Sequence, residues 1–363
     1  MQSTVTTAFS PGFARPVPYT GAWKGSGCMK QTLAAGLLLI LLLFLPPWLR
    51  WLNGSGEEAS RSSAQEKQET EKEQEESGSS DAVHTMRLWD GETTQTMPVG
   101  EYLLGVVRGE MPAAFEAEAL MAQAVAERTY LYYAMAAAPK KNHPDADVCT
   151  DPGCCTAWLG EAEAREKWGD KFQQYEDKVR AAVADTDGQV VLYGGAPIMA
   201  VFHSSSAGAT ADSGDVWTAE LPYLVSVKSP ENAESVPNYY SVNTFSAETF
   251  RTAFCKAHPE AKLSGGTEGW IRDTALTEDG RVASAVVGGV TVSGKELRSL
   301  YALRSTAFTV EADGSSVTFR VTGYGHGVGM SQYGANELAR QGKPWREILQ
   351  WYYTGVTIGL YNG

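Results

Sequence analysis

The chain has 363 residues, of which 43% are hydrophobic and 20% are charged, a composition typical of a globular protein rather than a disordered one. Asp and Glu outnumber Lys and Arg by 43 to 30, which gives a formal net charge of −13. Because a nucleic-acid-binding protein needs a basic face, this balance argues against a nucleic acid as partner. The length allows one large domain or two of ordinary size.

The N-terminal part combines basic residues with a long apolar run. Between Lys30 and Arg50 lie 19 uncharged residues, and about 20 apolar residues span a bilayer as a helix. A cleaved signal peptide is the alternative, but Pro46-Pro47-Trp48 stands where a small-residue cleavage site is expected. We therefore predict a cytoplasmic tail over residues 1–30 and a single-pass transmembrane anchor over residues 31–49. The rest of the chain then lies outside the cytoplasm.

The segment after the anchor is strongly acidic. Residues 53–81 contain nine acidic and three basic residues, with no aromatic and no aliphatic β-branched residue. Such a segment cannot bury enough apolar surface to offset its ordering entropy. We predict a disordered linker over residues 50–81, followed by one folded domain over residues 82–363.

Helix signals dominate the first part of this domain. The stretch after Pro112, AAFEAEALMAQAVAERTYLYYAMAAA, has no Gly or Pro and is rich in good helix formers. Pro112 suits the first turn of that helix. A second helix is expected over residues 161–184. Residues 189–193 are then predicted to form a strand, which a turn at Gly194-Gly195 connects to a second strand. This is the pattern of a hairpin.

The remainder mixes short strands with helices. Short strands are expected within residues 243–322, for example VASAVVGGVTVSG. Ser331 is a candidate N-cap for a helix that stops at Gly342, and a further helix over residues 344–353 precedes a last strand over residues 355–361. The predicted fold class is α+β, one mixed domain with helices packed on antiparallel strands.

The first candidate site is the sequence Gly109-Glu110-Met111-Pro112. Glu110 follows an apolar stretch, and a carboxyl among apolar neighbours has a raised pKa and can donate a proton near neutral pH. The alternative is an ordinary carboxylate at a helix N-terminus, which favours the anion. The two interpretations shift the pKa in opposite directions, so the residues alone leave both open.

Two further clusters combine polar residues with glycine. The sequence HSSSAGATADSGDVW, beginning at His203, could supply a Ser–His–Asp hydrolase, but no G-x-S-x-G motif is present. The alternative is a polar strand end that lines a cleft. In residues 323–334, GYGHGVGMSQYG, alternating glycines allow close approach of a ligand, but the spacing does not match G-x-G-x-x-G and predicts no dinucleotide site.

A fourth group has the composition of a metal site. His143, Cys149, Cys154 and Cys155 place one imidazole and three thiols within 13 residues, and Zn²⁺ favours such a tetrahedral set. A disulfide, plausible outside the cytoplasm, and free cysteines are the alternatives. Cys255 has no obvious partner in the sequence.

Taken together, these motifs resemble the stage II sporulation protein D family. The similarity rests on EMP at 110–112 followed by EALMAQAVAERTY, on HSSSAGATADSGDVW, on PYLVSV, and on GYGHGVGMSQYGANELARQGKPWREILQWYYTGV. These occur in the family's order over about residues 85–363. The resemblance implies a membrane-anchored lytic transglycosylase that cuts peptidoglycan glycan strands during forespore engulfment. It also implies a partner cell-wall amidase or endopeptidase, and engulfment proteins of the membrane.

The resemblance also implies roles for individual residues. Glu110 matches the catalytic glutamate. Arg128 is a supporting residue, since 18 residues of continuous helix would place it roughly 27 Å away. The substrate-binding residues would be Arg128, His203, Ser204, Ser205, Ser206, Tyr223 and His326.

The implied reaction is consistent with one acidic residue. A lytic transglycosylase uses the C6 hydroxyl of muramic acid instead of water, so one Glu can act first as acid and then as base. Relatives with a zinc site in the same insertion use two His and two Cys, and Cys154 here replaces a His. The resemblance thus favours a structural zinc. The alternative function is a non-catalytic wall-binding module that enhances an amidase.

Overall fold

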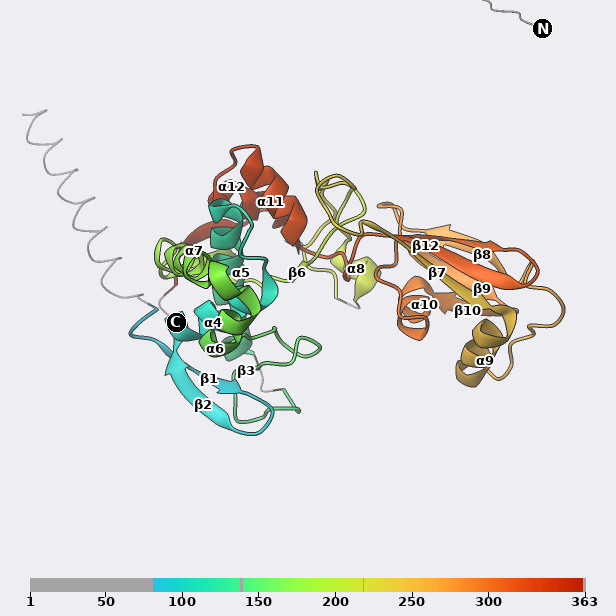
Figure 1. Cartoon of the computed structure of the whole chain (residues 1–363), viewed down its shortest axis with the longest axis horizontal. Coiled ribbons are helices and arrows are strands. Elements are labelled where there is room, and N and C mark those ends of the chain that lie inside the picture. Colours follow the sequence, from blue (N-terminus) through green and yellow to red (C-terminus); the bar gives the residue numbers. More distant parts are fainter. Residues whose placement is uncertain (1–80, 138–139, 218, 362–363) are drawn as a thin grey trace, which may run out of the picture. The chain divides into compact units, whose positions relative to one another are not determined.

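The computed structural model describes residues 81–137, 140–217 and 219–361 (Figure 1). The predicted tail, the predicted anchor and all but the last residue of the predicted linker lie outside these ranges. Asp81, that last residue, is buried and belongs to the folded domain. Within the described ranges, no helix is long and apolar enough to cross a membrane.

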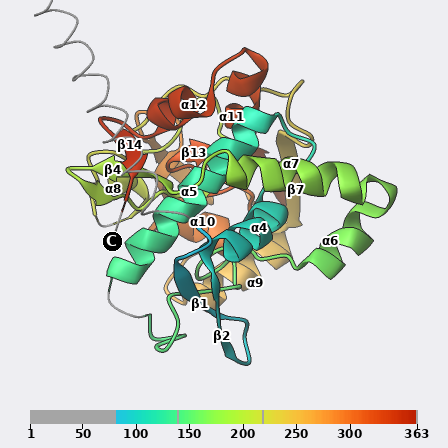
Figure 2. The same cartoon turned by 90° about the vertical axis from the view of Figure 1, so that its left-hand side faces the viewer.

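A first hydrophobic core is built mainly from helices. Its central helix is α5 (Ala117–Ala136), which contacts α4, α7, α11 and α12 (Figure 2). Because it is surrounded, α5 carries buried side chains on several faces instead of one apolar stripe. The other helices of this part are α4 (Val99–Glu110), α6 (Glu161–Trp168), the 3-10 turn η1 (Gly169–Lys171), α7 (Phe172–Ala184), α8 (Ser213–Val216), α11 (Gln332–Arg340) and α12 (Trp345–Tyr352).

Short strands border this core. Strand β4 lies between β14 and β5 in an antiparallel sheet, and β1 pairs with β2 antiparallel and with β3 in parallel. A two-residue parallel ladder joins β6 to β13 and sets His203 beside Ser331. The bounds are β1 (Thr85–Trp89), β2 (Thr94–Pro98), β3 (Val148–Cys149), β4 (Gln189–Tyr193), β5 (Ala196–Pro197), β6 (Phe202–His203), β13 (Met330–Ser331) and β14 (Thr357–Leu360).

A second hydrophobic core lies between strands and two helices. It contains an aromatic cluster in which Phe250 stacks on Tyr301 with ring centroids 4.6 Å apart. Two antiparallel sheets, ordered β11-β12-β7 and β10-β9-β8, form its walls. The elements are β7 (Tyr240–Ser246), α9 (Ala247–Ala257), β8 (Ile271–Leu276), β9 (Val282–Val287), β10 (Val290–Ser293), α10 (Gly294–Leu300), β11 (Phe308–Ala312) and β12 (Ser316–Thr322).

The structure confirms the predicted mixture of helices and antiparallel strands, and adds two short parallel pairs. The hairpin of β4 and β5, the Ser331 N-cap of α11, helix α12 and the last strand all form. The second predicted helix is split by Gly169, whose backbone is left-handed (φ 52°), into α6 and α7. The role given to Pro112 was wrong, because residues 111–116 form a turn between α4 and α5 and the helix begins only at Ala117.

Candidate active-site cleft and metal centre

One cleft of about 720 Å³ brings together residues from distant parts of the sequence. Glu110 lines it from the end of α4, and Gln332 lines it from the start of α11. Arg298 of α10 lines it from an element of the second core. The remaining lining residues are Tyr130, Pro152, Gly153, Cys154, Cys155, Thr156, Ala200, Val201, Phe202, His203, Ser204, Trp217, Tyr324, Gly325 and His326.

Glu110 is the last residue of α4, so the alternative that placed it at a helix N-terminus was wrong. The Ala157 N–H donates a hydrogen bond to its Oε1 (2.5 Å), and the Gln332 side-chain amide donates to its backbone carbonyl (3.0 Å). Burial raises the pKa of the Glu110 carboxyl above its ordinary value, and the hydrogen bond from Ala157 offsets part of that rise. The negative end of a helix also disfavours a carboxylate.

Two glycines of α4 allow the segment around Ala157 to reach Glu110. A Cβ on Gly109 would stand 2.8 Å from the Ala157 carbonyl oxygen, and one on Gly105 would stand 1.9 Å from Nε1 of Trp158. Any larger residue at these positions would push the segment away from the helix. The donor to Glu110 therefore depends on close backbone packing.

A second carboxyl, Glu127 on α5, interacts electrostatically with Glu110. Glu127 is fully buried and does not line the cleft. Gln123 donates a hydrogen bond to its Oε1 (2.9 Å), while its Oε2 has no partner among the described residues. Burial, and then the charge of Glu110, raise the pKa of Glu127 well above its ordinary value. Glu127 therefore holds its proton when Glu110 loses one.

His203 is buried with both ring nitrogens occupied. Its Nδ1–H donates to the Val328 carbonyl (3.2 Å), so Nε2 accepts from the Ser206 hydroxyl (2.7 Å). Burial and the nearby His326 lower the pKa of His203 well below its ordinary value. No Asp completes a triad, because the partner of Nδ1 is a backbone carbonyl. The arrangement does not support a Ser–His–Asp hydrolase.

His326 faces the same cleft. The Val328 N–H donates to its Nδ1 (3.1 Å), and its ring lies 5.3 Å from that of Trp217. Burial and the charge of Arg298 lower the pKa of His326 to about 4, so it is neutral at pH 7. Of the serines, Ser204 lines the cleft, whereas Ser205 and Ser206 are buried behind it.

Arg128 and Tyr223 do not line this cleft. Arg128 has no exposed side-chain surface and forms an ion pair with Asp81 (2.6 Å). The Tyr223 hydroxyl accepts from the Met199 N–H (3.3 Å), and its ring packs in the first core. Both positions indicate structural roles, although the motif resemblance predicted substrate binding.

A buried carboxylate holds three of the surrounding segments together. Glu231 accepts hydrogen bonds at Oε1 from the Ser206 N–H (2.6 Å) and the Ser331 hydroxyl (2.5 Å). At Oε2 it accepts from the Ser229 hydroxyl (2.5 Å), which also contacts the Tyr352 hydroxyl. Glu231 thus fixes Ser206, and through it the ring orientation of His203.

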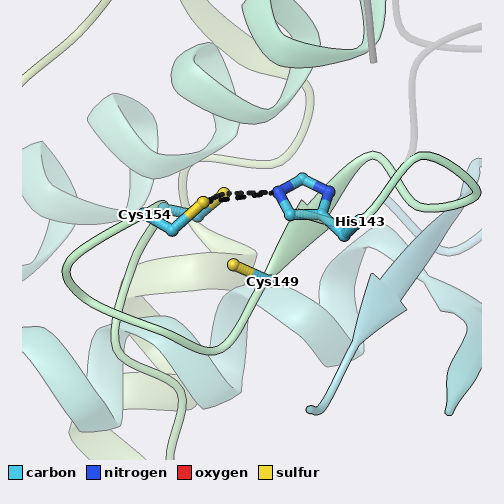
Figure 3. A group of neighbouring side chains, drawn as sticks. His143, Cys149 and Cys154 are labelled. Carbon is cyan, nitrogen blue, oxygen red and sulfur yellow. Dashed lines mark hydrogen bonds between the residues drawn. The ribbon is translucent and has the colours of Figure 1, made fainter. Parts of the chain in front are cut away.

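The four predicted metal ligands converge in space. The candidate ligand atoms of His143, Cys149, Cys154 and Cys155 all lie within 4.8 Å of one another (Figure 3). The His143 Nε2 lies 3.6 Å from Sγ of Cys154 and 3.4 Å from Sγ of Cys155, and the two sulfurs are 4.0 Å apart. Tetrahedral zinc with usual bond lengths requires about 3.5 Å between N and S and about 3.8 Å between two S atoms. The donor set therefore fits zinc.

The contacts that the four ligand residues make with their neighbours also suit a metal. The Nδ1–H of His143 donates to the Ala146 carbonyl (3.2 Å), which leaves Nε2 as the ligand nitrogen. Lys140 lies 3.2 Å from Sγ of Cys155 and can offset the negative charge of three thiolates. The four described cysteines are free of disulfides. The segment that carries the four candidate ligands, residues 143–155, leads directly to Ala157, whose N–H donates to Glu110.

Comparison with known proteins places these features in a family. The family model described as "Stage II sporulation protein" matches residues 90–193. The chain is 37% identical over 268 residues to the stage II sporulation protein D of Bacillus subtilis (strain 168), covering 74% of this chain and 76% of that protein. This chain belongs to the stage II sporulation protein D family. The protein of the same name from Bacillus amyloliquefaciens is 38% identical over 267 residues, covering 73% and 75% of the two chains.

A further relative is the amidase enhancer of Bacillus subtilis, which is 27% identical over 306 residues. The match covers 71% of this chain but 40% of that protein. Residues 90–193, which match the family model of stage II sporulation proteins, contain Glu110 and the complete His–Cys cluster.

Sequence reasoning missed four residues of the site in this family member: Glu127, Glu231, Arg298 and Gln332. Glu127 could have been noticed as a carboxyl on the buried side of a helix otherwise rich in Ala and Leu. The other three carry no local signal, because their roles arise only from contacts between segments far apart in the chain.

Proposed function

We propose that this protein is a membrane-anchored lytic transglycosylase that cleaves the glycan strands of peptidoglycan during sporulation. The observation that carries the proposal is the acid–base content of the cleft. Among the described lining residues, Glu110 is the only Asp or Glu, and burial raises its pKa toward the range of a proton donor. His203 and His326 are neutral, and hydrogen bonds already engage both nitrogens of His203.

A single carboxyl suits this reaction better than hydrolysis. Glycosidases that hydrolyse the bond require a second carboxylate at the sugar, either to attack it or to activate water. Glu127 is the nearest candidate, but it is fully buried and does not line the cleft. In the proposed reaction the muramic acid C6 hydroxyl attacks C1 of the same sugar. The product is a 1,6-anhydro end, and no water is consumed.

Glu110 would perform both proton transfers. As the glycosidic C1–O bond breaks, its carboxylic acid gives a proton to the leaving oxygen. As the C6–O–C1 bond forms, the resulting carboxylate takes the proton of the C6 hydroxyl and returns to its starting state. Ala157 would hold Oε1 in place through its hydrogen bond, so that Oε2 is the oxygen free to exchange the proton.

The alternative is a wall-binding module that stimulates an amidase, as the name of one relative suggests. A module of that kind needs a glycan-binding cleft but no acid of raised pKa. The half-buried position of Glu110, which raises the pKa of its carboxyl, therefore favours the enzyme.

The test is to follow glycan cleavage by mass spectrometry with the full chain in detergent. We expect anhydro-muramic ends, whereas hydrolysis would give ends heavier by one water. Replacing Glu110 by Gln should slow product formation about 10²–10⁴-fold, because a positioned acid–base group contributes that much. Glu101→Gln, on the exposed side of the same helix, is the matched control. Normal turnover by the Glu110→Gln protein would refute the mechanism.

We also propose that His143, Cys149, Cys154 and Cys155 bind a structural zinc ion. Four protein ligands fill a tetrahedral shell and leave no position for an activated water. The metal would therefore supply cross-linking of the residue 143–157 segment rather than chemistry on the substrate.

A further inference from the structure

Arg298 lines the cleft without an acidic partner. It lies in the last turn of α10, and its Nε–H donates to the Leu303 carbonyl (3.3 Å). Its two terminal nitrogens form no hydrogen bond or ion pair within the described part of the chain. Among the described lining residues it is the only Lys or Arg, as Glu110 is the only acid.

The three buried arginines of the described chain are paired with acids, whereas the half-buried Arg298 and Arg304 are not. Arg108 pairs with Glu176, Arg128 with Asp81 and Arg281 with Asp279. Arg298 is half-buried, and burial lowers its pKa although the guanidinium stays charged at neutral pH. A half-buried charge without a counterion is unfavourable, and an anion entering the cleft would remove that penalty.

The surroundings of Arg298 suit a sugar that carries an anion. Tyr324 lines the same cleft with 47% of its surface exposed, and Arg304 stacks on its ring at 4.4 Å. Arg298 also acts electrostatically on His203 and His326, so its charge lies near these two neutral side chains of the cleft. Exposed aromatic rings offer flat apolar faces, while the guanidinium fork matches a carboxylate.

We propose that Arg298 binds the lactyl carboxylate of a muramic acid residue in the glycan strand, an inference that rests on the proposed function. N-acetylglucosamine lacks this group, so an ion pair with Arg298 would distinguish the two alternating sugars. Only cleavage beside muramic acid C1 can yield a 1,6-anhydro-muramic end. Arg298 would therefore set the register in which the strand meets Glu110. In a strand that still carries stem peptides the same carboxyl is an amide and cannot form the ion pair.

The test measures binding to the full chain carrying Glu110→Gln, so that the ligand is not consumed. Calorimetry would compare a peptide-free GlcNAc–MurNAc oligosaccharide, the same oligosaccharide with stem peptides, and an N-acetylglucosamine oligomer of equal length. Adding Arg298→Gln should weaken binding of the peptide-free strand about ten- to hundredfold, the usual range for a hydrogen-bonded charge pair. Binding of the N-acetylglucosamine oligomer should stay unchanged. Arg298→Lys should restore part of the affinity, because it keeps the charge but loses the fork.

The matched control is Arg320→Gln, which removes one positive charge from an exposed arginine that pairs with Glu311 and lies outside this cleft. A loss equal for both oligosaccharides, or no loss for Arg298→Gln with unchanged thermal midpoint, overturns the inference while leaving the proposed function intact. A preference for the strand with stem peptides that disappears in Arg298→Gln would assign the arginine to a peptide carboxylate and also overturn it. Failure of the Glu110→Gln protein to bind any of the three ligands would overturn both proposals.

Discussion

Two carboxyl centres of the domain, Glu231 and the neighbouring pair Glu110 and Glu127, differ in their supply of hydrogen-bond donors. Glu231 receives three hydrogen bonds, from Ser206, Ser229 and Ser331. Glu110 receives one at its carboxyl and Glu127 receives one, with an oxygen of Glu127 left unpartnered. No Lys or Arg of the described chain forms an ion pair with any of the three.

This difference separates a structural carboxylate from a chemical one. Donors replace the water that a carboxylate loses on burial, so a donor-rich site can hold the anion and tie segments together. A donor-poor site favours the protonated acid, which is the form that can give a proton to a leaving group. The number of donors, more than burial itself, distinguishes the two centres. Three experiments test or sharpen this comparison.

The largest effect is expected from removing the proposed zinc, because residues 143–157 carry the only donor to the Glu110 carboxyl among the described residues. Structural zinc contributes on the order of 10 kcal/mol of folding free energy in small zinc domains. Elemental analysis of the untagged chain should find one zinc per chain. Chelation should make the segment around residue 150 sensitive to protease and reduce release of anhydro ends.

The control for the metal experiment is Cys255→Ser, a cysteine on α9 in the second core, which should retain full zinc content. Cys149→Ser should lose it. Absence of zinc together with a disulfide at Cys149, found by mass spectrometry, would show that the oxidised alternative is correct.

The next largest effect is expected at Glu231. Glu231→Ala leaves three donors without their acceptor, and each buried unsatisfied donor costs about 1–3 kcal/mol. The free energy of unfolding, measured by urea denaturation, should therefore fall by about 3 kcal/mol or more. The free energy of unfolding should fall less in the Glu231→Gln protein, because the amide oxygen can still accept from Ser206 and Ser331. Exposed Glu248 on α9 offers the control Glu248→Ala, and equal losses at the two positions would contradict the structural role.

How far the sequence predicts this site depends on the range of the interactions. The Ser331 cap and the His143–Cys155 cluster arise from residues close in sequence, so spacing was sufficient to predict that each would come together. Helix α4 was not predicted, because Gly105 and Gly109 lower the helix propensity of this segment. The two glycines are explained by tertiary packing, since they make room for Ala157 and Trp158. Glu231 and Arg298 lack any local pattern, since their partners or neighbours come from remote segments.

The smallest effect at low pH is expected for Glu127→Gln, whose amide mimics the protonated acid. In the folded chain the pKa of Glu127 lies well above its ordinary value, so the proton is held more tightly than in the unfolded chain. The stability that this proton confers is complete below the ordinary pKa and is lost as the pH rises through the raised pKa. At pH 4, below the ordinary pKa, the wild-type and Glu127→Gln proteins should differ by less than about 0.5 kcal/mol. At higher pH the variant should become the more stable of the two, by at most about 1.4 kcal/mol for each pH unit. Urea denaturation across pH 4–9 measures this trend, with Glu101→Gln expected to show none.

The alkaline decline of activity should be the same in the wild-type and Glu127→Gln proteins, because Glu127 is still protonated when Glu110 loses its proton. A flat difference in stability, or a displaced alkaline decline, would show that Glu127 is ionised while Glu110 works and that a scarcity of donors does not keep a buried carboxyl protonated here.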